Sequence, residues 1–240
     1  VPRTIIGLYY SASVYPRTLR RSKIHYITAA PLNHLGLKIE FYDVYKGLPD
    51  LEGRDDVRGI LSWFPSGTNL DDPVTYLKWA MDQIDQGRKY VVMGNPGFYE
   101  DAKGKDTSPV YINRFLRKLG LKDTGHWIEL TYDVDFIYKN PKMMEYERRL
   151  TGYIPSYQAL QIFDRKVIPH LIVRKAGNDK NDAVLVTTGP NGGYVAERYT
   201  YYYDEESEVE IRQWLINPFE FFRAAYQTDD LPKLDTTTLA

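Results

Sequence analysis

Residues Arg58–Gly94 read RGILSWFPSGTNLDDPVTYLKWAMDQIDQGRKYVVMG, and this stretch decides the expected fold. The apolar runs at 58–64 and 90–93 each predict a buried strand. Between them, an acidic pair followed by Pro73 marks a helix start and Gly87 marks its end. A strand, a helix and a strand of these lengths form a βαβ unit, in which the two strands lie parallel in one sheet.

The rest of the first half continues this alternation. Strands are expected at 4–10 and 37–44, and helices at 19–35 and 110–119. Right-handed crossovers between parallel strands then favour an α/β fold. We expect a three-layer sandwich with a mainly parallel sheet, flavodoxin-like or class I glutamine-amidotransferase-like.

The second half has a different pattern and predicts a β-rich C-terminal extension. Glycines at 189–193 predict a tight turn between two strands. A final helix is expected at 209–226, with Pro218 marking a kink or a break. Residues 1–230 are therefore expected to form a single α/β domain, and the polar stretch 231–240 a linker to a missing downstream domain. Shorter strands are expected at 127–130, 134–138, 157–163, 167–174 and 183–188, with a strand or hairpin at 194–204.

Composition excludes several classes of protein. The 240 residues carry 31 Lys and Arg against 32 Asp and Glu, and this net charge of −1 argues against a nucleic-acid partner. No apolar run approaches the length of a membrane span. The chain has no cysteine, which removes thiol nucleophiles and thiolate metal ligands.

Cofactor and metal signatures are also missing. The four histidines, His25, His34, His126 and His170, are too far apart in sequence for a local zinc pair. Neither dinucleotide nor phosphate-loop spacing is present. We therefore expect no metal and no cofactor.

The turn after the strand at 90–93 reads Gly94-Asn95-Pro96-Gly97. Amidotransferase-like folds place a nucleophilic cysteine in this kind of turn. Here the position holds Asn95 or Pro96, and neither can attack a carbonyl carbon. The sequence therefore predicts no catalytic residue at this point.

Aromatic residues gather at the expected carboxyl ends of the strands. Ligand sites in open parallel sheets form at these ends, and a sugar ring stacks on aromatic faces while its hydroxyls bind nearby amides and carboxylates. Plain core packing under the loops is the alternative, above all for a tryptophan that points into the helix layer. The candidate substrate-binding residues are Tyr10, Asp43, Trp63, Phe64, Asn95, Phe98 and Tyr99.

A second interpretation is catalytic. Asp43, Glu100 and Asp101 follow expected strands, and two of them could act as the acid and base of a glycoside hydrolase if their spacing allows it. Since the chain has 32 acidic residues, some fall near a crevice by chance.

Four short stretches carry a family resemblance: PLNHLG at 31–36, RGILSWF at 58–64, WLINPFEFF at 214–222 and DTTT at 235–238. They resemble the region that precedes the deacetylase domain in PelA-like bacterial proteins. Those multidomain proteins combine a glycoside hydrolase with a polysaccharide deacetylase and act in exopolysaccharide production. Their deacetylase motifs do not occur here, so the resemblance carries over no catalytic residue.

The resemblance implies a non-catalytic accessory domain of an envelope polysaccharide-modifying protein. Its expected partners are a polysaccharide and neighbouring domains of the same chain, and its expected location is the bacterial periplasm or cell envelope. A glycoside hydrolase that uses the strand-end carboxylates and a purely structural interdomain module are the alternatives.

Overall fold

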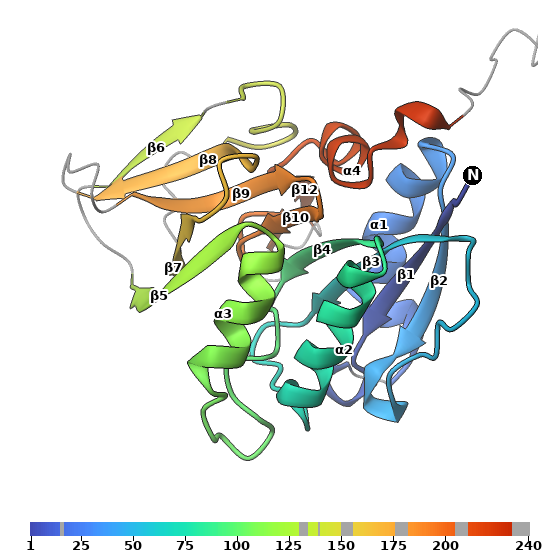
Figure 1. The fold of residues 1–240 in the computed structure, drawn as a ribbon. Coiled ribbons are helices and arrows are strands. Elements are labelled where there is room, and N and C mark those ends of the chain that lie inside the picture. Colours follow the sequence, from blue (N-terminus) through green and yellow to red (C-terminus); the bar gives the residue numbers. More distant parts are fainter. Residues whose placement is uncertain are drawn as a thin grey trace, which may run out of the picture.

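The computed structural model describes residues 1–14, 17–129, 134–138, 140–149, 156–175, 182–204 and 211–231 (Figure 1). Within these ranges, eight strands form one sheet in the order β2-β1-β3-β4-β10-β9-β8-β6. Their bounds are β1 (Thr4–Tyr9), β2 (Lys38–Asp43), β3 (Val57–Phe64), β4 (Lys89–Gly94), β6 (Val134–Tyr138), β8 (Ile168–Lys175), β9 (Ala183–Gly189) and β10 (Gly192–Val195).

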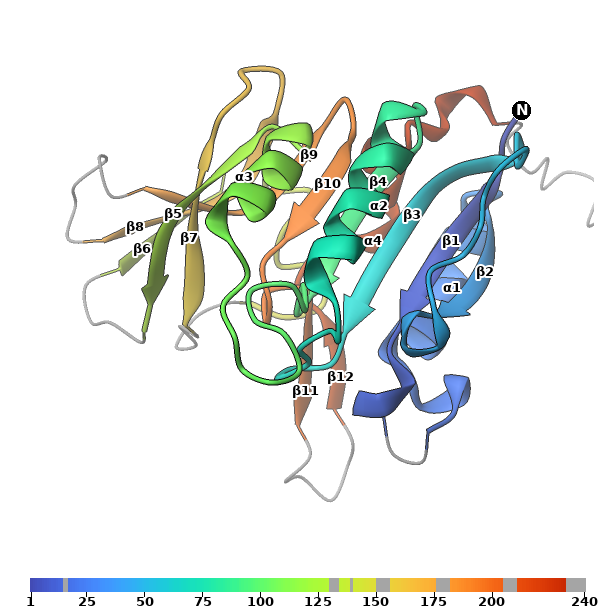
Figure 2. The same cartoon turned by 60° about the horizontal axis from the view of Figure 1, so that its bottom comes forward.

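Two antiparallel ribbons accompany the large sheet in the described part of the chain. One pairs β5 (Leu121–Ile128) with β7 (Tyr157–Ile162), and the other pairs β11 (Tyr201–Asp204) with β12 (Ile211–Trp214). Helices α2 and α3 pack together on one face of the sheet, while α1 and α4 pack together on the other (Figure 2). The helices are α1 (Lys23–His34), α2 (Pro73–Asp85), α3 (Pro109–Lys118) and α4 (Pro218–Tyr226).

None of the helices in the described ranges has both the length and the apolar character needed to cross a membrane.

The expected mainly parallel sandwich, whether flavodoxin-like or class I glutamine-amidotransferase-like, is wrong. Strands β2, β1, β3, β4 and β10 run parallel, but β9, β8 and β6 continue the same sheet with antiparallel pairings. The protein is thus a mixed α/β fold with more strands than helices. Its second half is not an extension, because those strands complete the main sheet. Local patterns could not identify β10 as the neighbour of β4, since that pairing joins distant parts of the chain.

Two local expectations also change. The expected helix at 209–226 is strand β12 followed by helix α4, so Pro218 begins a helix instead of kinking one. Asn217 caps α4 by accepting hydrogen bonds from the amides of Phe219 and Glu220, and proline suits the first helical turn.

The expected strand at 194–204 is divided between β10 and β11. The tight turn at 189–193 is confirmed, because Gly189 and Gly192 face each other across a β9–β10 hairpin. The expected linker lies outside the described residues from position 232 on.

Strand β10 fits beside β4 because Gly192 has no side chain. Its φ is +132°, and a Cβ atom there would lie 1.9 Å from the carbonyl oxygen of Tyr90. The Tyr90 amide also donates a 2.7 Å hydrogen bond to the carbonyl of Asn191. The two backbones therefore approach at a distance that only glycine permits.

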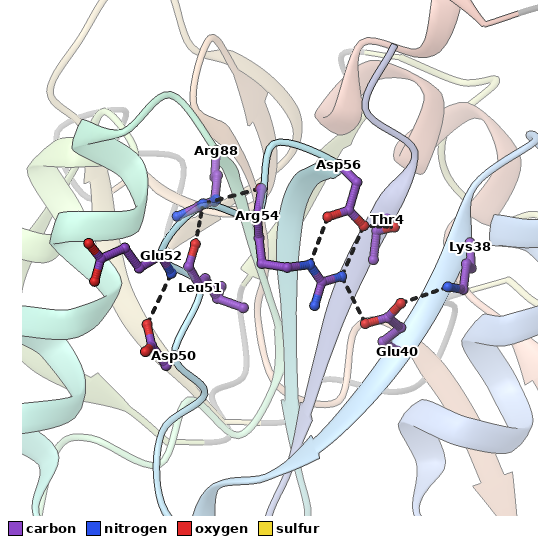
Figure 3. A network of polar contacts seen from close by, with 9 residues as sticks. All are labelled: Thr4, Lys38, Glu40, Asp50, Leu51, Glu52, Arg54, Asp56 and Arg88. Atoms are coloured by element: carbon purple, nitrogen blue, oxygen red, sulfur yellow. Dashed lines mark hydrogen bonds and ion pairs between the residues drawn. The ribbon is translucent and has the colours of Figure 1, made fainter.

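A polar network joins the amino ends of β1, β2 and β3 (Figure 3). The Arg54 guanidinium donates to both carboxylate oxygens of Asp56, at 2.7 and 2.9 Å, and to Glu40 at 3.0 Å. The Thr4 hydroxyl donates to Asp56 at 2.7 Å. The Arg54 hydrogen bonds, and then that of Thr4, hold the pKa of Asp56 well below its usual range. This network closes the end of the sheet opposite the carboxyl ends of the parallel strands.

The Gly192 contact predicts a specific cost of adding one methyl group. We expect Gly192→Ala to lower the free energy of unfolding by at least about 3 kcal/mol, because the Cβ atom collides with backbone and not with a movable side chain. Chemical denaturation measures this difference.

Gly104→Ala is the matched control. Gly104 also has a positive φ, +78°, but nothing lies within 4 Å of a Cβ atom built there. We expect it to cost about 1 kcal/mol, from backbone strain alone. Equal costs for the two variants would show that the β4–β10 contact is not the constraint.

A buried histidine predicts how stability depends on pH. His170 on β8 is buried, its Nε2 lies 2.8 Å from the Thr188 hydroxyl on β9, and burial lowers its pKa to about 4. The unfolded chain binds this proton near pH 6.5, whereas the folded chain resists it until about pH 4. Stability should therefore be complete above pH 6.5 and fall by up to about 3 kcal/mol as the pH drops to 4.

We expect His170→Gln to reduce the difference in unfolding free energy between pH 7.5 and pH 4.5, measured by urea denaturation. His126→Gln, at an exposed position, should keep the full difference. The account fails if both variants respond to pH as the unaltered chain does.

Candidate functional site

The five parallel strands end along one rim of the sheet, and this rim carries the candidate site. Strands β1, β3 and β10 point toward the lower edge of the molecule in Figure 2, where the loops that follow them lie. Open α/β sheets bind ligands outside these carboxyl ends. We call one cavity at this rim, of about 200 Å³, the Trp127 pocket. Its lining residues are Asn69, Asn95, Pro96, Tyr99, Glu100, Trp127, Tyr157, Gln158, Tyr194 and Glu197.

A bulge in the β5–β7 ribbon positions Trp127. Residue 123 pairs with 160 and residue 127 with 158, so residues 124–126 lie opposite Ala159 alone. Gly125 has a φ of +77°, and its amide donates a 2.8 Å hydrogen bond to the Asp123 carboxylate. Bulges of this kind redirect the side chains beside them. The indole of Trp127 is 50% exposed at the edge of the pocket.

Tyrosines form the inner wall of the pocket. Burial raises the pKa values of Tyr99 and Tyr194 above the usual value for tyrosine, and the nearby Asp123 carboxylate adds to the effect. Both phenols are therefore protonated at neutral pH. The Asp123 carboxylate is itself held by Gln158, which donates a 2.8 Å hydrogen bond from its side-chain amide. These residues provide a rigid aromatic surface that also carries hydroxyl and amide groups.

Two carboxylates line the same pocket. Glu100 is exposed and has one long contact, 3.5 Å, with the side-chain amide of Asn69. Glu197 is partly buried, and its Oε1 is enclosed without a hydrogen-bond partner in the described part of the chain. An enclosed carboxylate oxygen without a donor is costly. A ligand that brings a hydroxyl or N–H group to this oxygen would remove that cost.

The structure brings two of the predicted binding residues, Asn95 and Tyr99, together in this pocket with Glu100, one of the candidate catalytic carboxylates. Asn95 directly follows β4, and its side-chain oxygen accepts a 2.8 Å hydrogen bond from the Gly97 amide. The turn that would hold a nucleophile in an amidotransferase is therefore part of the pocket wall. Tyr10 lies in a separate cavity of the same rim.

The other predicted aromatic residues belong to the core. Phe64 is buried, with its ring 6.4 Å from that of Tyr10, and Phe98 is buried with its ring 5.6 Å from that of Phe115. Trp63 precedes Phe64 on β3, so it points to the opposite face of the sheet. There its ring centroid lies 6.3 Å from that of Trp214. These three side chains therefore pack in the core and do not line the Trp127 pocket.

The structure does not assemble the catalytic pair considered from the sequence. Asp43 accepts backbone hydrogen bonds from Ser11 at 3.0 Å and Tyr45 at 3.2 Å. Asp101 accepts them from Lys103 at 2.8 Å and Lys105 at 2.9 Å, which lowers its pKa. Both carboxylates hold loops in place, and of the three candidates only Glu100 lines the Trp127 pocket.

Sequence reasoning missed most of the pocket. Trp127, Tyr157, Gln158, Tyr194 and Glu197 all come from the second half of the chain. A tryptophan at the start of an expected short strand, two residues after a glycine, was the available signal, but nothing local placed it next to Asn95. In the described ranges, no three His, Asp or Glu side chains gather in a way that could hold a metal ion.

Comparisons with known proteins give little further information. No family model and no curated protein matches this chain. A solved structure of a cold-adapted beta-galactosidase from Rahnella sp. R3 overlaps 97% of this chain, with 11% sequence identity and a TM-score of 0.47. The chain spans 32% of that protein's chain. A similarity this weak carries no argument about function.

Because the Oε1 atom of Glu197 is enclosed without a hydrogen-bond donor among the described residues, we expect this carboxylate to lower the stability of the chain without a ligand. We expect Glu197→Gln to raise the free energy of unfolding by about 1 kcal/mol, because it removes a charge that lacks a donor. The exposed Glu100→Gln should change it by less than about 0.5 kcal/mol. Urea denaturation compares the two variants. If Glu197→Gln instead destabilises the chain, the carboxylate has a structural partner and is not reserved for a ligand.

Proposed function

We propose that this chain is a non-catalytic carbohydrate-binding domain that holds a sugar ring in the Trp127 pocket. The observation that carries the proposal is the half-exposed indole of Trp127 at the mouth of a pocket lined by amides, phenols and carboxylates. A sugar offers a C–H face that stacks on such a ring and hydroxyls that bind such polar groups.

The size of the pocket limits the ligand. Sites for drug-sized molecules usually occupy about 300–1,000 Å³, whereas this pocket holds about 200 Å³. A group the size of one sugar ring suits this volume better than a larger cofactor. We therefore propose that one unit of a glycan enters the pocket and the remainder lies outside it.

We further propose an accessory role in a polysaccharide-modifying protein of the bacterial cell envelope. The short sequence resemblance to PelA-like proteins supports this context. In it the domain would position a polysaccharide for neighbouring domains of the same chain.

A titration of the 240-residue chain tests the binding proposal. The probes are monomers and oligomers of glucose, N-acetylglucosamine, glucosamine and galacturonic acid, followed by calorimetry. We expect one of these series to bind, and Trp127→Ala to weaken that binding by about 10-fold, because stacking on an aromatic ring contributes about 1 kcal/mol or more. Glu197→Gln should also weaken it.

Phe163→Ala is the control for Trp127→Ala. Phe163 is 54% exposed, close to the exposure of Trp127, and does not line the pocket. We expect its removal to leave binding unchanged. If the unaltered chain binds none of the four series, the binding proposal is overturned and a purely structural role is favoured.

Glycoside hydrolysis is the second candidate, because Glu100 and Glu197 line one pocket and such enzymes use two carboxylates. Analysis of the recovered probes separates the two functions. Intact oligomers after long incubation support binding alone. New reducing ends that disappear in Glu100→Gln would establish hydrolysis.

A further inference from the structure

We infer that the ligand is a linear oligosaccharide that runs along the rim of the sheet and occupies a second pocket beside Tyr45. This inference rests on the proposed function and adds to it the class of ligand and another binding position. We call the second cavity, of about 370 Å³, the Tyr45 pocket. Its lining includes Tyr10, Tyr45, Lys46, Asp71, Asp72 and Tyr76.

Tyr45 offers an aromatic surface like that of Trp127. It is 45% exposed, whereas the two other tyrosines of this pocket, Tyr10 and Tyr76, are buried. The Tyr10 ring packs edge-on against it with a centroid distance of 5.5 Å, and the Arg17 guanidinium carbon lies 5.8 Å from its centroid. These contacts hold the Tyr45 ring at the pocket edge, and the guanidinium adds hydrogen-bond donors beside it.

The polar groups around Tyr45 suit the hydroxyls of a sugar. Burial, and then the adjacent Asp71 carboxylate, raise the pKa of Tyr10 to about 12, so its hydroxyl is protonated. Asp72 caps helix α2 by accepting from the Thr75 amide at 3.0 Å and the Thr75 hydroxyl at 2.7 Å. Asp71 and the exposed Lys46 complete a wall with both acceptor and donor groups.

The two pockets share one rim and are separated by a single loop. Asn69 lines the Trp127 pocket, while the next residues, Leu70 and Asp71, line the Tyr45 pocket. Backbone hydrogen bonds of 3.0 Å from Leu70 to Gly97 and from Ala102 to Leu70 fix this loop. The loop that separates the two pockets is therefore held in place by backbone hydrogen bonds.

The spacing of the strands shows which ligand could reach both pockets. Tyr45 follows β2, and Tyr194 of the Trp127 pocket lies on β10. Strand order places four inter-strand spacings between β2 and β10, which is about 19 Å. A single sugar ring cannot span this distance, but a linear chain of several rings can.

A ligand that occupies both pockets should bind more tightly as it lengthens. Once one ring is held in the Trp127 pocket, the second contact becomes intramolecular and benefits from a high effective concentration. Affinity should therefore rise steeply when the chain becomes long enough to reach Tyr45, and then level off.

The test uses the oligosaccharide series that binds the unaltered 240-residue chain, from monomer to hexamer, with calorimetry at each length. We expect the hexamer to bind at least about 10-fold more tightly than the dimer. Tyr45→Ala should remove this gain and leave monomer and dimer binding unchanged, while Tyr45→Phe should preserve the gain. Trp127→Ala should weaken binding at every length.

Tyr146→Ala is the matched control, because Tyr146 has the same 45% exposure and its ring packs instead against Phe219 of α4. Its binding should equal that of the unaltered chain at all lengths. A gain from dimer to hexamer that survives Tyr45→Ala, or an equal loss of affinity at every length, overturns this inference but leaves the proposed function intact. No binding by the unaltered chain at any length overturns the proposed function itself.

Discussion

The close approach of β10 to β4 at Gly192 is the constraint on which the molecule depends. A side chain at this position would meet the backbone of Tyr90, so the absence of one lets the second half of the chain join the sheet. Once β10 is in place, β9, β8 and β6 add to it by antiparallel pairing. The same insertion carries Tyr194 and Glu197 to the rim where Asn95 and Tyr99 lie. The candidate site is therefore a consequence of this one strand pairing.

The two ends of the parallel strands are built differently. At the amino ends, Arg54 ties Asp56 and Glu40 together, and Thr4 adds a hydrogen bond (Figure 3). Because the three charged side chains are partly exposed, their ion pairs contribute modestly to stability, but they define strand positions. At the carboxyl ends, the carboxylates of Asp43 and Asp101 are used to hold loops. The two pockets are lined by aromatic rings together with the carboxylates of Glu100 and Glu197 in one and of Asp71 and Asp72 in the other.

Local sequence patterns predicted individual strands and helices, which depend on residues near one another in the chain. The apolar runs at 4–10, 58–64 and 90–93 correspond to strands β1, β3 and β4, and the proline at position 73 begins α2 as expected. The fold class was wrong because Gly192 and Gly193 carry a turn signal that gives no sign of the neighbouring β4. Asn95, Tyr99 and Glu100 were found by the rule that sites form at strand ends. Trp127 and Glu197 were missed because their position depends on a bulge and on a long-range pairing, neither of which has a periodic signature.

Tryptophan fluorescence tests the central claim, that a sugar stacks on Trp127, most directly. The chain has 4 tryptophans; Trp63 and Trp214 are buried and Trp79 is partly buried, so Trp127 is the half-exposed one. A saturating concentration of the bound oligosaccharide should shift the emission to shorter wavelength and reduce quenching by iodide, and Trp127→Phe should abolish both changes. Saturation confirmed by calorimetry without any change in quenching would show that the ligand binds elsewhere and would contradict the account.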